Sequence, residues 1–594
     1  MKYKATFLGT VEDVNGASVR VLLSNKSLSG LVYVDGQGYR IGQIGTFVKI
    51  PIGFTQMFGI ISQVGASSVP DTKIDESPYG NRWMTVQLVG EASSNKLFQR
   101  GICQYPTIGD EVHLVSKKDL ARIYGKSSDA NYIKIGSITN SDSIPALLDI
   151  DKLITRHSSI VGSTGSGKSN TVTALLRSIN SGKYPKAKNI IIDPHSEYNT
   201  ALKDLSKVYS IEGENSLRIP YWCLSYSELA LILFDRRQPV DSQQDLKVQQ
   251  EIIKQKIEVA KSLKIGSIPE NQISVDSPVP FDLKKVWYNL YLEENATVNK
   301  ADDFSTIAYE KDKDGNPLKG DKDNLVPPKF IHAEPGKKSP HLFVKNKTLT
   351  SYLQKLRGKL LDKRFEFLFN TVDFNGTSKD LDILLDEWIN HSHPITILDL
   401  GGIPFEIMDL AVGLISRLIF ETMFWGRYLD GIGRQRPVLM VYEEAHSYLP
   451  KGGSSQFVQG YASNAVRRIC KEGRKYGIGA LVVSQRPSDL DTSILSQCGT
   501  FITLRLSSTD DQSIIRSSIP DNSSSLAESL PSLRTGEAIV VGEAIQIPSR
   551  IAIPLMKPRP DSHDAIPSKE WKNDKIEKPE FSKAIANWRK QKTN

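Results

Sequence analysis

A glycine-rich stretch of the chain carries the residue types that bind phosphate groups. Residues 162–169 read G-S-T-G-S-G-K-S and match the pattern G-x-x-x-x-G-K-[ST] in full. In this pattern the glycines let backbone N–H groups face phosphate oxygens, and the residues after the loop begin a helix. We therefore predict a site for a nucleoside triphosphate and Mg²⁺. Its binding residues are Gly162, Ser163, Thr164, Gly165, Ser166, Gly167, Lys168, Ser169 and Asn170.

Two side chains of this loop have specific expected roles. Lys168 reaches the β- and γ-phosphates and therefore serves in catalysis as well as in binding. Ser169 offers its hydroxyl to Mg²⁺ at the start of the helix. The alternative, a Gly/Ser-rich turn without a ligand, is disfavoured by the apolar strand expected at 158–161 and the amphipathic helix expected at 168–179.

A second segment delivers paired carboxylates from an apolar strand. Residues 438–446 read V-L-M-V-Y-E-E-A-H, and carboxylates beside a phosphate loop are what metal-assisted phosphoryl transfer requires. Because neighbouring side chains diverge, we assign Glu443 to Mg²⁺ and its water shell, and Glu444 to orienting the attacking water. The alternative is that both glutamates are helix-start acids stabilised by the macrodipole.

Two further segments supply a polar sensor and cations. Residues 479–487 predict an apolar strand that ends at Gln485, which is placed to sense the γ-phosphate. Residues 463–476 predict a helix rich in arginine and lysine, including Arg468 and Arg474. Basic helix faces are usually solvated, but nucleotide hydrolysis also needs a cation against the charge of its transition state.

The elements that must position these groups form an α/β core. Strands and helices alternate from about residue 150, which predicts a parallel sheet with ligands at the carboxyl ends of its strands. Two more strand ends fit this scheme. The segment 190–198, I-I-I-D-P-H-S-E-Y, leaves ionisable groups beyond a buried strand, and another strand is expected at 395–400.

Regions outside the core have different patterns. Residues 1–125 show short apolar runs punctuated by glycine turns, which predict a small β-barrel without a catalytic cluster, suited to docking. Residues 235–390 predict a helical insertion, which includes a basic amphipathic helix at 349–369 that faces either DNA or water. Residues 312–316 suggest a calcium loop, but the glycine is misplaced and the closing glutamate is missing. Residues 556–594 form a basic tail.

The composition argues against a disulfide-rich protein, a zinc protein and a membrane-spanning protein. The chain has 594 residues, a net charge of +8 and four cysteines without paired spacing, so neither a disulfide framework nor a zinc site is indicated. No run approaches the about 18 to 20 apolar residues of a membrane helix, and the N-terminus lacks the apolar core of a signal peptide. We therefore expect a cytoplasmic protein that is not bound to a membrane.

The motifs together resemble the HerA branch of the HerA/FtsK ATPases. The similarity rests on R-H-S-S-I-V-G-S-T-G-S-G-K-S-N, I-I-I-D-P-H-S-E-Y, V-Y-E-E-A-H-S-Y-L-P and C-K-E-G-R-K-Y-G-I-G-A-L-V-V-S-Q-R-P-S. It implies an N-terminal barrel and a RecA-like core at 131–234 and 391–555. It also implies that Arg156 and an arginine between Arg468 and Arg474 sense nucleotide or act in trans. Glu443 departs from the aspartate that many such strands carry.

The resemblance further implies a homohexameric ring that hydrolyses ATP and moves double-stranded DNA through its pore, together with a partner nuclease. HerA-like bacterial proteins of this size also resemble members of antiphage operons, in which the partner is a nuclease or a sirtuin-like NAD-hydrolysing protein. Two functions therefore remain open. One is a DNA translocase with helicase-like activity, and the other is an ATP-dependent ring that organises an effector docked on the barrel.

Overall fold

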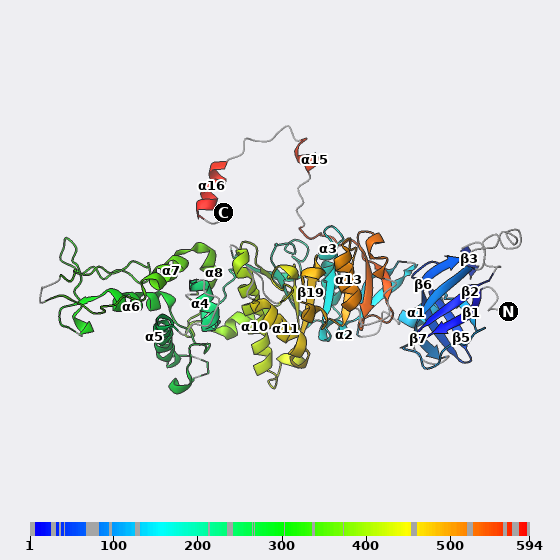
Figure 1. The fold of residues 1–594 in the computed structure, drawn as a ribbon, viewed down its shortest axis with the longest axis horizontal. Coiled ribbons are helices and arrows are strands. Elements are labelled where there is room, and N and C mark those ends of the chain that lie inside the picture. The colour runs from blue at the N-terminus through cyan, green and yellow to red at the C-terminus, as the bar shows by residue number, and fades with distance from the viewer. Residues whose placement is uncertain are drawn as a thin grey trace.

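The computed structural model shows an elongated chain with three successive parts and a separate tail. In Figure 1 the barrel lies at one end, the α/β core in the middle and the helical insertion at the other end, while the C-terminal helices stand off beside the body. The structure describes all residues except 1–5, 25–30, 35–36, 41, 67–81, 94–97, 125–130, 140, 212–213, 235–241, 264, 267, 302, 335–338, 372, 453–459, 519–526, 562–566, 573–580 and 591–594.

The N-terminal part is a closed β-barrel, as predicted. Its strands follow the order β2-β1-β9-β5-β6-β7, and β7 pairs with β2, so the sheet closes on itself and leaves no free edge in that ring. Burial alternates strictly along most of β7, as expected for a strand with one face in the barrel core. The bounds are β1 (Phe7–Asn15), β2 (Ser18–Leu23), β5 (Phe47–Ile52), β6 (Thr55–Ala66), β7 (Arg82–Ser93) and β9 (Glu111–Leu114), with β8 (Gln99–Arg100) attached to β7 and a hairpin of β3 (Leu31–Val34) and β4 (Gln37–Arg40).

A short helix, α1 (Lys117–Tyr124), joins the barrel to the core. Lys49 of the barrel pairs with Asp119 of this helix at 2.8 Å, and both side chains are largely buried. The hydroxyls of Tyr124 and Ser549 share a hydrogen bond of 2.5 Å on the core side. Buried residues of the barrel, the helix and the core form one continuous apolar cluster, so the barrel is packed onto the core.

The core contains an 11-stranded sheet in the order β11-β10-β22-β21-β20-β12-β19-β18-β13-β17-β14. The strands from β20 to β14 run parallel, and the others are added antiparallel at one side. The bounds are β10 (Tyr132–Ile138), β11 (Ser141–Asp149), β12 (Ser158–Val161), β13 (Lys188–Asp193), β14 (Ser206–Ser210), β17 (Ile395–Asp399), β18 (Val438–Tyr442), β19 (Ile478–Ser484), β20 (Thr500–Thr503), β21 (Glu537–Gly542) and β22 (Ser549–Ala552).

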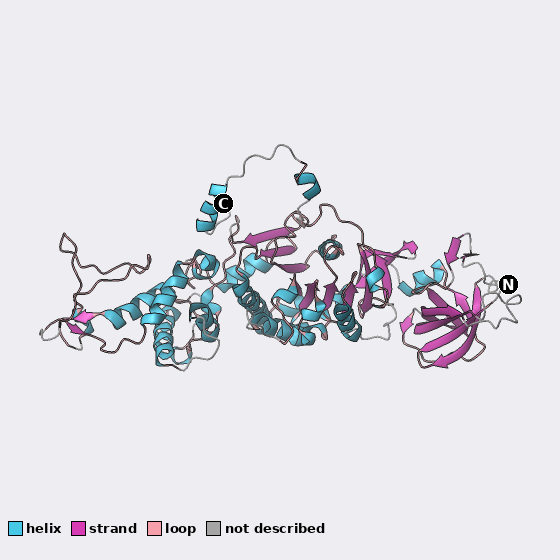
Figure 2. Cartoon of the chain, turned by 45° about the horizontal axis from the view of Figure 1, so that its top comes forward, coloured by secondary structure: helices cyan, strands magenta, loops and turns pink. Residues whose placement is uncertain are grey.

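Helices cover both faces of this sheet (Figure 2), so every residue of β12, β13, β18 and β19 is buried. The helices are α2 (Ile150–Thr155), α3 (Lys168–Ile179), α10 (Phe405–Trp425), α11 (Tyr461–Glu472), α12 (Thr492–Leu495) and α13 (Thr509–Ser518). This is the RecA-like arrangement that was predicted. The strand order brings the carboxyl ends of β12, β19, β18 and β13 next to one another, which is where the chemical groups are needed.

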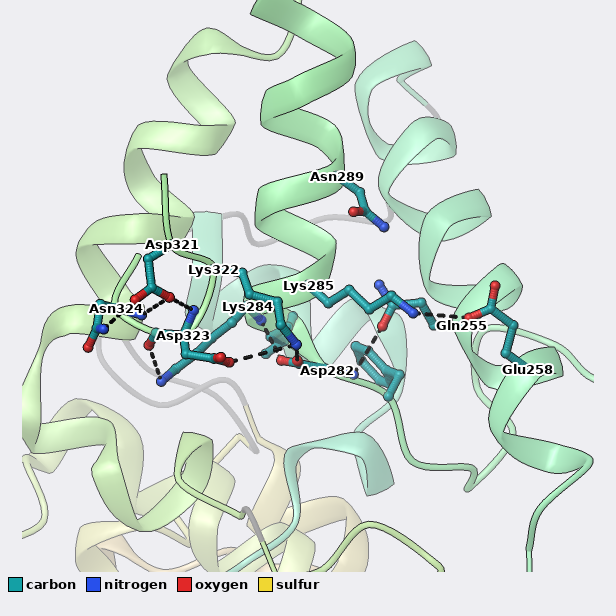
Figure 3. Close-up of polar contacts among 12 residues, drawn as sticks. Gln255, Glu258, Asp282, Lys284, Lys285, Asn289, Asp321, Lys322, Asp323 and Asn324 are labelled. Carbon is teal, nitrogen blue, oxygen red and sulfur yellow. Dashed lines mark hydrogen bonds and ion pairs between the residues drawn. The ribbon is translucent and has the colours of Figure 1, made fainter. Parts of the chain in front are cut away.

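The insertion is helical, also as predicted. Its helices are α5 (Gln243–Ala260), α6 (Leu283–Asn295), α7 (Thr350–Leu361), α8 (Glu366–Phe369) and α9 (Leu381–Ile389), and a small sheet joins β15 (Thr297–Val298) to β16 (His341–Leu342); α4 (Tyr226–Phe234) directly precedes the insertion. Ion pairs connect these elements. Lys285 of α6 pairs with Glu258 of α5 at 3.0 Å, and Lys284 donates to the backbone oxygen of Asp323 at 2.8 Å (Figure 3). These contacts border a cavity of about 680 Å³ that is also lined by Phe281, Phe365 and Phe369.

The basic stretch expected at 349–369 is not one continuous helix. Helix α7 ends at Leu361, and Asp362 caps the next short turn by accepting a hydrogen bond from the backbone of Arg364. Two of its basic side chains donate hydrogen bonds to backbone oxygens of neighbouring segments. Lys355 donates to the backbone oxygen of Phe234 at 3.2 Å, and Arg357 donates to that of Leu325 at 2.9 Å. These two contacts favour a structural role for Lys355 and Arg357.

The tail leaves the core after β22 and carries two short helices, α15 (Pro567–Glu570) and α16 (Phe581–Lys590). Large apolar side chains of this region are exposed, among them Trp571, Phe581 and Trp588. Throughout the described ranges, no helix has both the length and the apolar character needed to cross a bilayer.

Candidate active site

The loop between β12 and α3 has the geometry of a phosphate cradle. Gly165 and Gly167 have φ of +71° and +105°, which side chains disfavour. A Cβ atom at Gly162 would come within 2.6 Å of Ser166 Oγ and 2.8 Å of Leu504 Cβ, so only glycine fits there. The Ser166 hydroxyl is buried and has no hydrogen-bond partner among the described residues. The loop thus fits a ligand that approaches its backbone and supplies acceptor oxygens.

Neighbouring strands hold this loop in place. The backbone N–H and the hydroxyl of Ser163 both donate to the backbone oxygen of Arg505, each at 2.9 Å. On the other side, the N–H of Gly536 donates to the backbone oxygen of Ser166 at 3.0 Å. These contacts come from the ends of β20 and β21, and they preorganise the loop before a ligand binds.

Glu444 lies directly beyond β18, in a backbone conformation that is rare for a glutamate. Its φ is +46°, in the left-handed region. The Nδ1 atom of His446 lies 3.2 Å from Glu444 Oε2, within ion-pair distance but without the alignment of a hydrogen bond. Burial acts to raise the pKa of Glu444, but the contact with His446 and the charge of Lys168 outweigh it, so the pKa lies below its ordinary value. The carboxylate is therefore charged at neutral pH.

Glu443 is placed differently, inside the protein. Its side chain is almost fully buried; Oε1 accepts a hydrogen bond from the Tyr198 hydroxyl, and Oε2 accepts one from the backbone N–H of Glu444 at 3.2 Å. Burial raises the pKa of Glu443 well above its ordinary value, and the nearby charges of Glu197 and Glu444 raise it further. Burial likewise raises the pKa of Asp193 to about 7. Acidic groups therefore crowd together here, and such crowding favours a bound cation.

Gln485 connects the loop with the carboxylate. It follows β19 directly, and its Oε1 accepts a hydrogen bond from the Thr164 hydroxyl at 2.6 Å. The nearby side chain of Gln485 also helps to lower the pKa of Glu444. Beside these residues lies a cavity of about 340 Å³, which His446, Arg486 and Asp511 also line.

The predicted arginines lie in different surroundings. Arg156 caps the end of α2, just before β12, and its Nε lies 3.5 Å from Glu543 Oε2. Arg468 of α11 pairs with Glu421 at 2.6 Å and stacks over the ring of Phe420 at 4.2 Å. Arg474 is exposed in the turn after α11, and no ion pair links it to the described part of its own chain.

The structure also reveals contacts that the sequence did not predict. The Ser169 hydroxyl donates to Glu197 Oε2 at 2.5 Å. The amide of Asn170 bonds the tail, donating to the backbone oxygen of Pro554 at 3.0 Å and accepting from Met556 N at 2.8 Å. Glu197 could have been suspected from the ionisable groups at 190–198, since they follow a buried strand. The contacts of Asn170 could not be predicted from the sequence, because its partners are backbone atoms, which every residue has.

Comparisons with known proteins agree with this geometry. Residues 133–419 match the family model of the central domain of the helicase HerA. A probable helicase of Methanocaldococcus jannaschii is 25% identical over 476 residues, which cover 79% of this chain and 75% of that protein. The DNA double-strand break repair helicase HerA of Sulfurisphaera tokodaii is 26% identical over 489 residues, covering 81% of this chain and 80% of the relative. Among solved structures, VirB4 of Thermoanaerobacter pseudethanolicus is 14% identical with a TM-score of 0.43, covering 75% of this chain and 100% of the other.

The family match and the motifs coincide in the chain. The matched range 133–419 contains the phosphate loop and the segment from Asp193 to Tyr198, and the alignments with the relatives extend over about four-fifths of the chain. The phosphate loop, the strand-end carboxylates and these similarities together show that residues 133–419 form a central domain of the HerA type, within a chain that is similar to HerA helicases over about four-fifths of its length.

Proposed function

We propose that the chain is an ATP-hydrolysing motor that acts on double-stranded DNA as a homohexamer, together with a partner effector. The observation that carries the ATPase part is the convergence of a complete phosphate loop, Glu444 and Gln485 at adjacent strand ends. A scaffold that only bound nucleotide would not need a charged glutamate and a polar sensor beside the phosphate loop.

ATP and Mg²⁺ fit the residues that are present. The glycine loop leaves room for phosphates at its backbone, and the buried Ser166 hydroxyl has no partner among the described residues. Lys168 would hold the outer phosphates, while Ser169 and the cluster of carboxylates that includes Glu443 would hold the metal. When bound, Mg²⁺ supplies positive charge against the developing charge of the phosphates.

Other side chains of the chain have separate roles in hydrolysis. Glu444 orients the attacking water, because its carboxylate is charged and lies close enough to Lys168 of the loop to feel its charge. Gln485 senses the γ-phosphate and, as a neighbour of Glu444, alters the charge state of that carboxylate. Arg156 lies at the amino end of β12, whereas the phosphate loop follows the carboxyl end of the same strand, so Arg156 does not supply a cation to the loop of its own chain.

A further cation would come from a neighbouring subunit. Head-to-tail contacts that join one subunit's loop to the next subunit's arginine are heterologous and close into a ring. Arg474 suits this role better than Arg468, since it is exposed, whereas Arg468 is already paired with Glu421 and stacked on Phe420. The family resemblance supports six subunits.

The DNA part of the proposal rests on the relatives, among them a DNA double-strand break repair helicase. A motor that moves along duplex DNA contacts phosphates rather than base edges, so binding should not depend on sequence and should weaken with salt. The test is ATPase turnover of the full chain with and without random-sequence duplex at several salt concentrations. We expect stimulation by any duplex that disappears as the salt concentration rises.

A second candidate function is supported by the barrel surface. Tyr33, Phe54 and Ile108 are exposed apolar side chains on this part of the chain, and exposed apolar groups suit a docking surface. In this alternative the ring uses ATP to organise an antiphage effector, a nuclease or a sirtuin-like NAD-hydrolysing protein, with little DNA translocation. If turnover ignores duplex at low salt but responds to the genomic neighbour's product, this alternative replaces the DNA motor.

A further inference from the structure

Glu197 is the acidic residue that touches the loop serine. Ser169 is the final residue of the glycine motif, and its hydroxyl donates to Glu197 Oε2 at 2.5 Å. Mg²⁺ binds oxygen ligands and commonly uses one or two carboxylates beside the phosphates of its nucleotide. A carboxylate that already contacts Ser169 therefore stands closest to the place where a metal ion held by that hydroxyl would lie.

Glu443, which was predicted to bind the metal, instead accepts hydrogen bonds from other groups of the protein. Its two carboxylate oxygens accept hydrogen bonds from the Tyr198 hydroxyl and from the backbone N–H of Glu444. Its side chain is only 4% exposed. Glu197 is less buried, and its Oε1 accepts no hydrogen bond from the residues that the structure describes. The free acceptor of Glu197 is thus available to a cation or its water, whereas those of Glu443 are already in use.

The backbone around Glu197 is fixed from several sides. Asp193 accepts hydrogen bonds from the N–H groups of His195 and Tyr198, at 3.2 and 3.1 Å. The backbone oxygen of Glu197 accepts from the N–H of Asp561 at 2.7 Å, which ties the segment to the start of the tail. A carboxylate held in this way needs little rearrangement to meet a metal ion.

We propose that Glu197 is the carboxylate that neutralises the Mg²⁺ ion held at Ser169. Glu443 is then a positioning residue, which holds the Tyr198 hydroxyl and the backbone of Glu444. This assignment rests on the nucleotide function proposed above. It changes which glutamate faces the metal and leaves Glu444 as the group that orients water.

The test measures metal-dependent nucleotide binding in the full chain. Affinity for the fluorescent nucleotide mant-ADP is determined in EDTA and then with Mg²⁺, for the wild type, Glu197→Gln and Glu443→Gln. Glutamine retains an acceptor for Ser169 and removes only the charge. We expect Glu197→Gln to bind as the wild type does in EDTA and to lose about 10- to 100-fold of the gain from Mg²⁺. Glu443→Gln should retain most of that gain.

Two control variants distinguish loss of metal binding from a general effect of charge and from a failure to fold. Glu258→Gln removes an equal charge from the insertion, where Glu258 pairs with Lys285, and should leave the Mg²⁺ effect unchanged. If Glu197→Gln does not fold, Glu197→Asp retains the charge on a shorter arm and should show an intermediate gain; a full wild-type gain then contradicts the assignment.

Three results decide the matter. An undiminished Mg²⁺ gain in Glu197→Gln, or a larger loss in Glu443→Gln, overturns the proposal. Loss of binding by Glu197→Gln in EDTA gives Glu197 a structural role instead, and also overturns it. A wild type whose binding ignores Mg²⁺ refutes the nucleotide function itself, a failure that the variants do not produce.

Discussion

The hydroxyl of Thr164 donates a hydrogen bond to Oε1 of Gln485 at 2.6 Å and so joins the phosphate loop to the end of β19. The bond fixes which way the Gln485 amide points, because its oxygen is occupied by the hydroxyl. Its amide group is then available to Glu444, whose pKa the contact helps to lower. A change at the loop therefore reaches the water-orienting carboxylate through one side chain.

Removing the Thr164 hydroxyl should slow hydrolysis without weakening nucleotide binding. In Thr164→Val the Gln485 amide loses one neutral hydrogen bond, worth about 0.5 to 1.5 kcal/mol, which corresponds to a loss of about two- to tenfold in kcat. Thr164→Ser retains the hydroxyl and should behave as the wild type. Steady-state ATPase and mant-ADP binding measure the two quantities, and equal losses in both variants would contradict this role.

Glu444→Gln should retain nucleotide and lose turnover. The substitution keeps the size of the side chain and removes the negative charge that holds the attacking water, and loss of a general base typically lowers the rate by about 10² to 10⁴. Lys168→Ala should instead weaken nucleotide binding, since it removes the cation from the phosphates. Comparable ATPase rates in Glu444→Gln and the wild type would exclude Glu444 from this role.

Mixtures of two inactive proteins should regain ATPase activity. Glu444→Gln subunits retain Arg474, and Arg474→Ala subunits retain a complete loop, so some mixed interfaces contain both intact groups. The matched mixture with Arg468→Ala tests the other arginine, which we expect to matter less because Glu421 and Phe420 already hold it. Native mass measurement confirms that the mixed rings form. A fully active monomer, or mixed rings that stay inactive, rules out an arginine supplied in trans.

His157 should make folding sensitive to acid. Burial lowers the pKa of His157 to about 4, and a hydrogen bond with the backbone of Cys470 offsets this only in part. Since the ordinary pKa is about 6.5, the stabilising effect of a neutral His157 is complete above pH 6.5 and is lost as the pH falls toward 4. The full contribution is on the order of 3 kcal/mol.

The variant His157→Asn isolates this effect. Asparagine tolerates the φ of +55° at this position and offers an acceptor to the N–H of Ala480, which His157 Nδ1 accepts at 3.1 Å. The free energy of unfolding, measured by denaturant titration from pH 7 to 4, should fall less steeply in the variant. The exposed His332→Asn should match the wild type, and identical pH dependence in all three proteins would show that His157 does not titrate on unfolding.

Much of the fold could be predicted from the sequence because its signals are local. The short runs around 158–161, 190–193 and 438–442, rich in Ile and Val, identified the parallel core, and the alternation near residues 84–89 identified the barrel; both are confirmed. The positions of the domain boundaries stay predictions. The prediction of one continuous basic helix was wrong, because the helix ends before Asp362. The side chain of Asp362 accepts a hydrogen bond from the backbone N–H of Arg364, and this local contact competes with continuation of the helix.

The contacts within the site were harder to predict, since they join residues far apart in the chain. Thr164 and Gln485 are 321 positions apart, and Ser169 and Glu197 come from separate elements. Glu197 and Glu443 are both acidic residues at strand ends, and only the packing of Tyr198 against Glu443 separates their surroundings. Composition and spacing carry no information about such packing.

The junction between barrel and core has a mechanical consequence. Tyr124 is anchored to Ser549 at the start of β22, β22 pairs with β21, and Gly536, directly before β21, holds the backbone of Ser166. This path runs from the barrel junction through two paired strands to the loop. We therefore expect that a force applied to the barrel shifts these strands and, through them, the backbone of the phosphate loop. A load on the barrel would then alter the geometry of the site where the nucleotide phosphates bind.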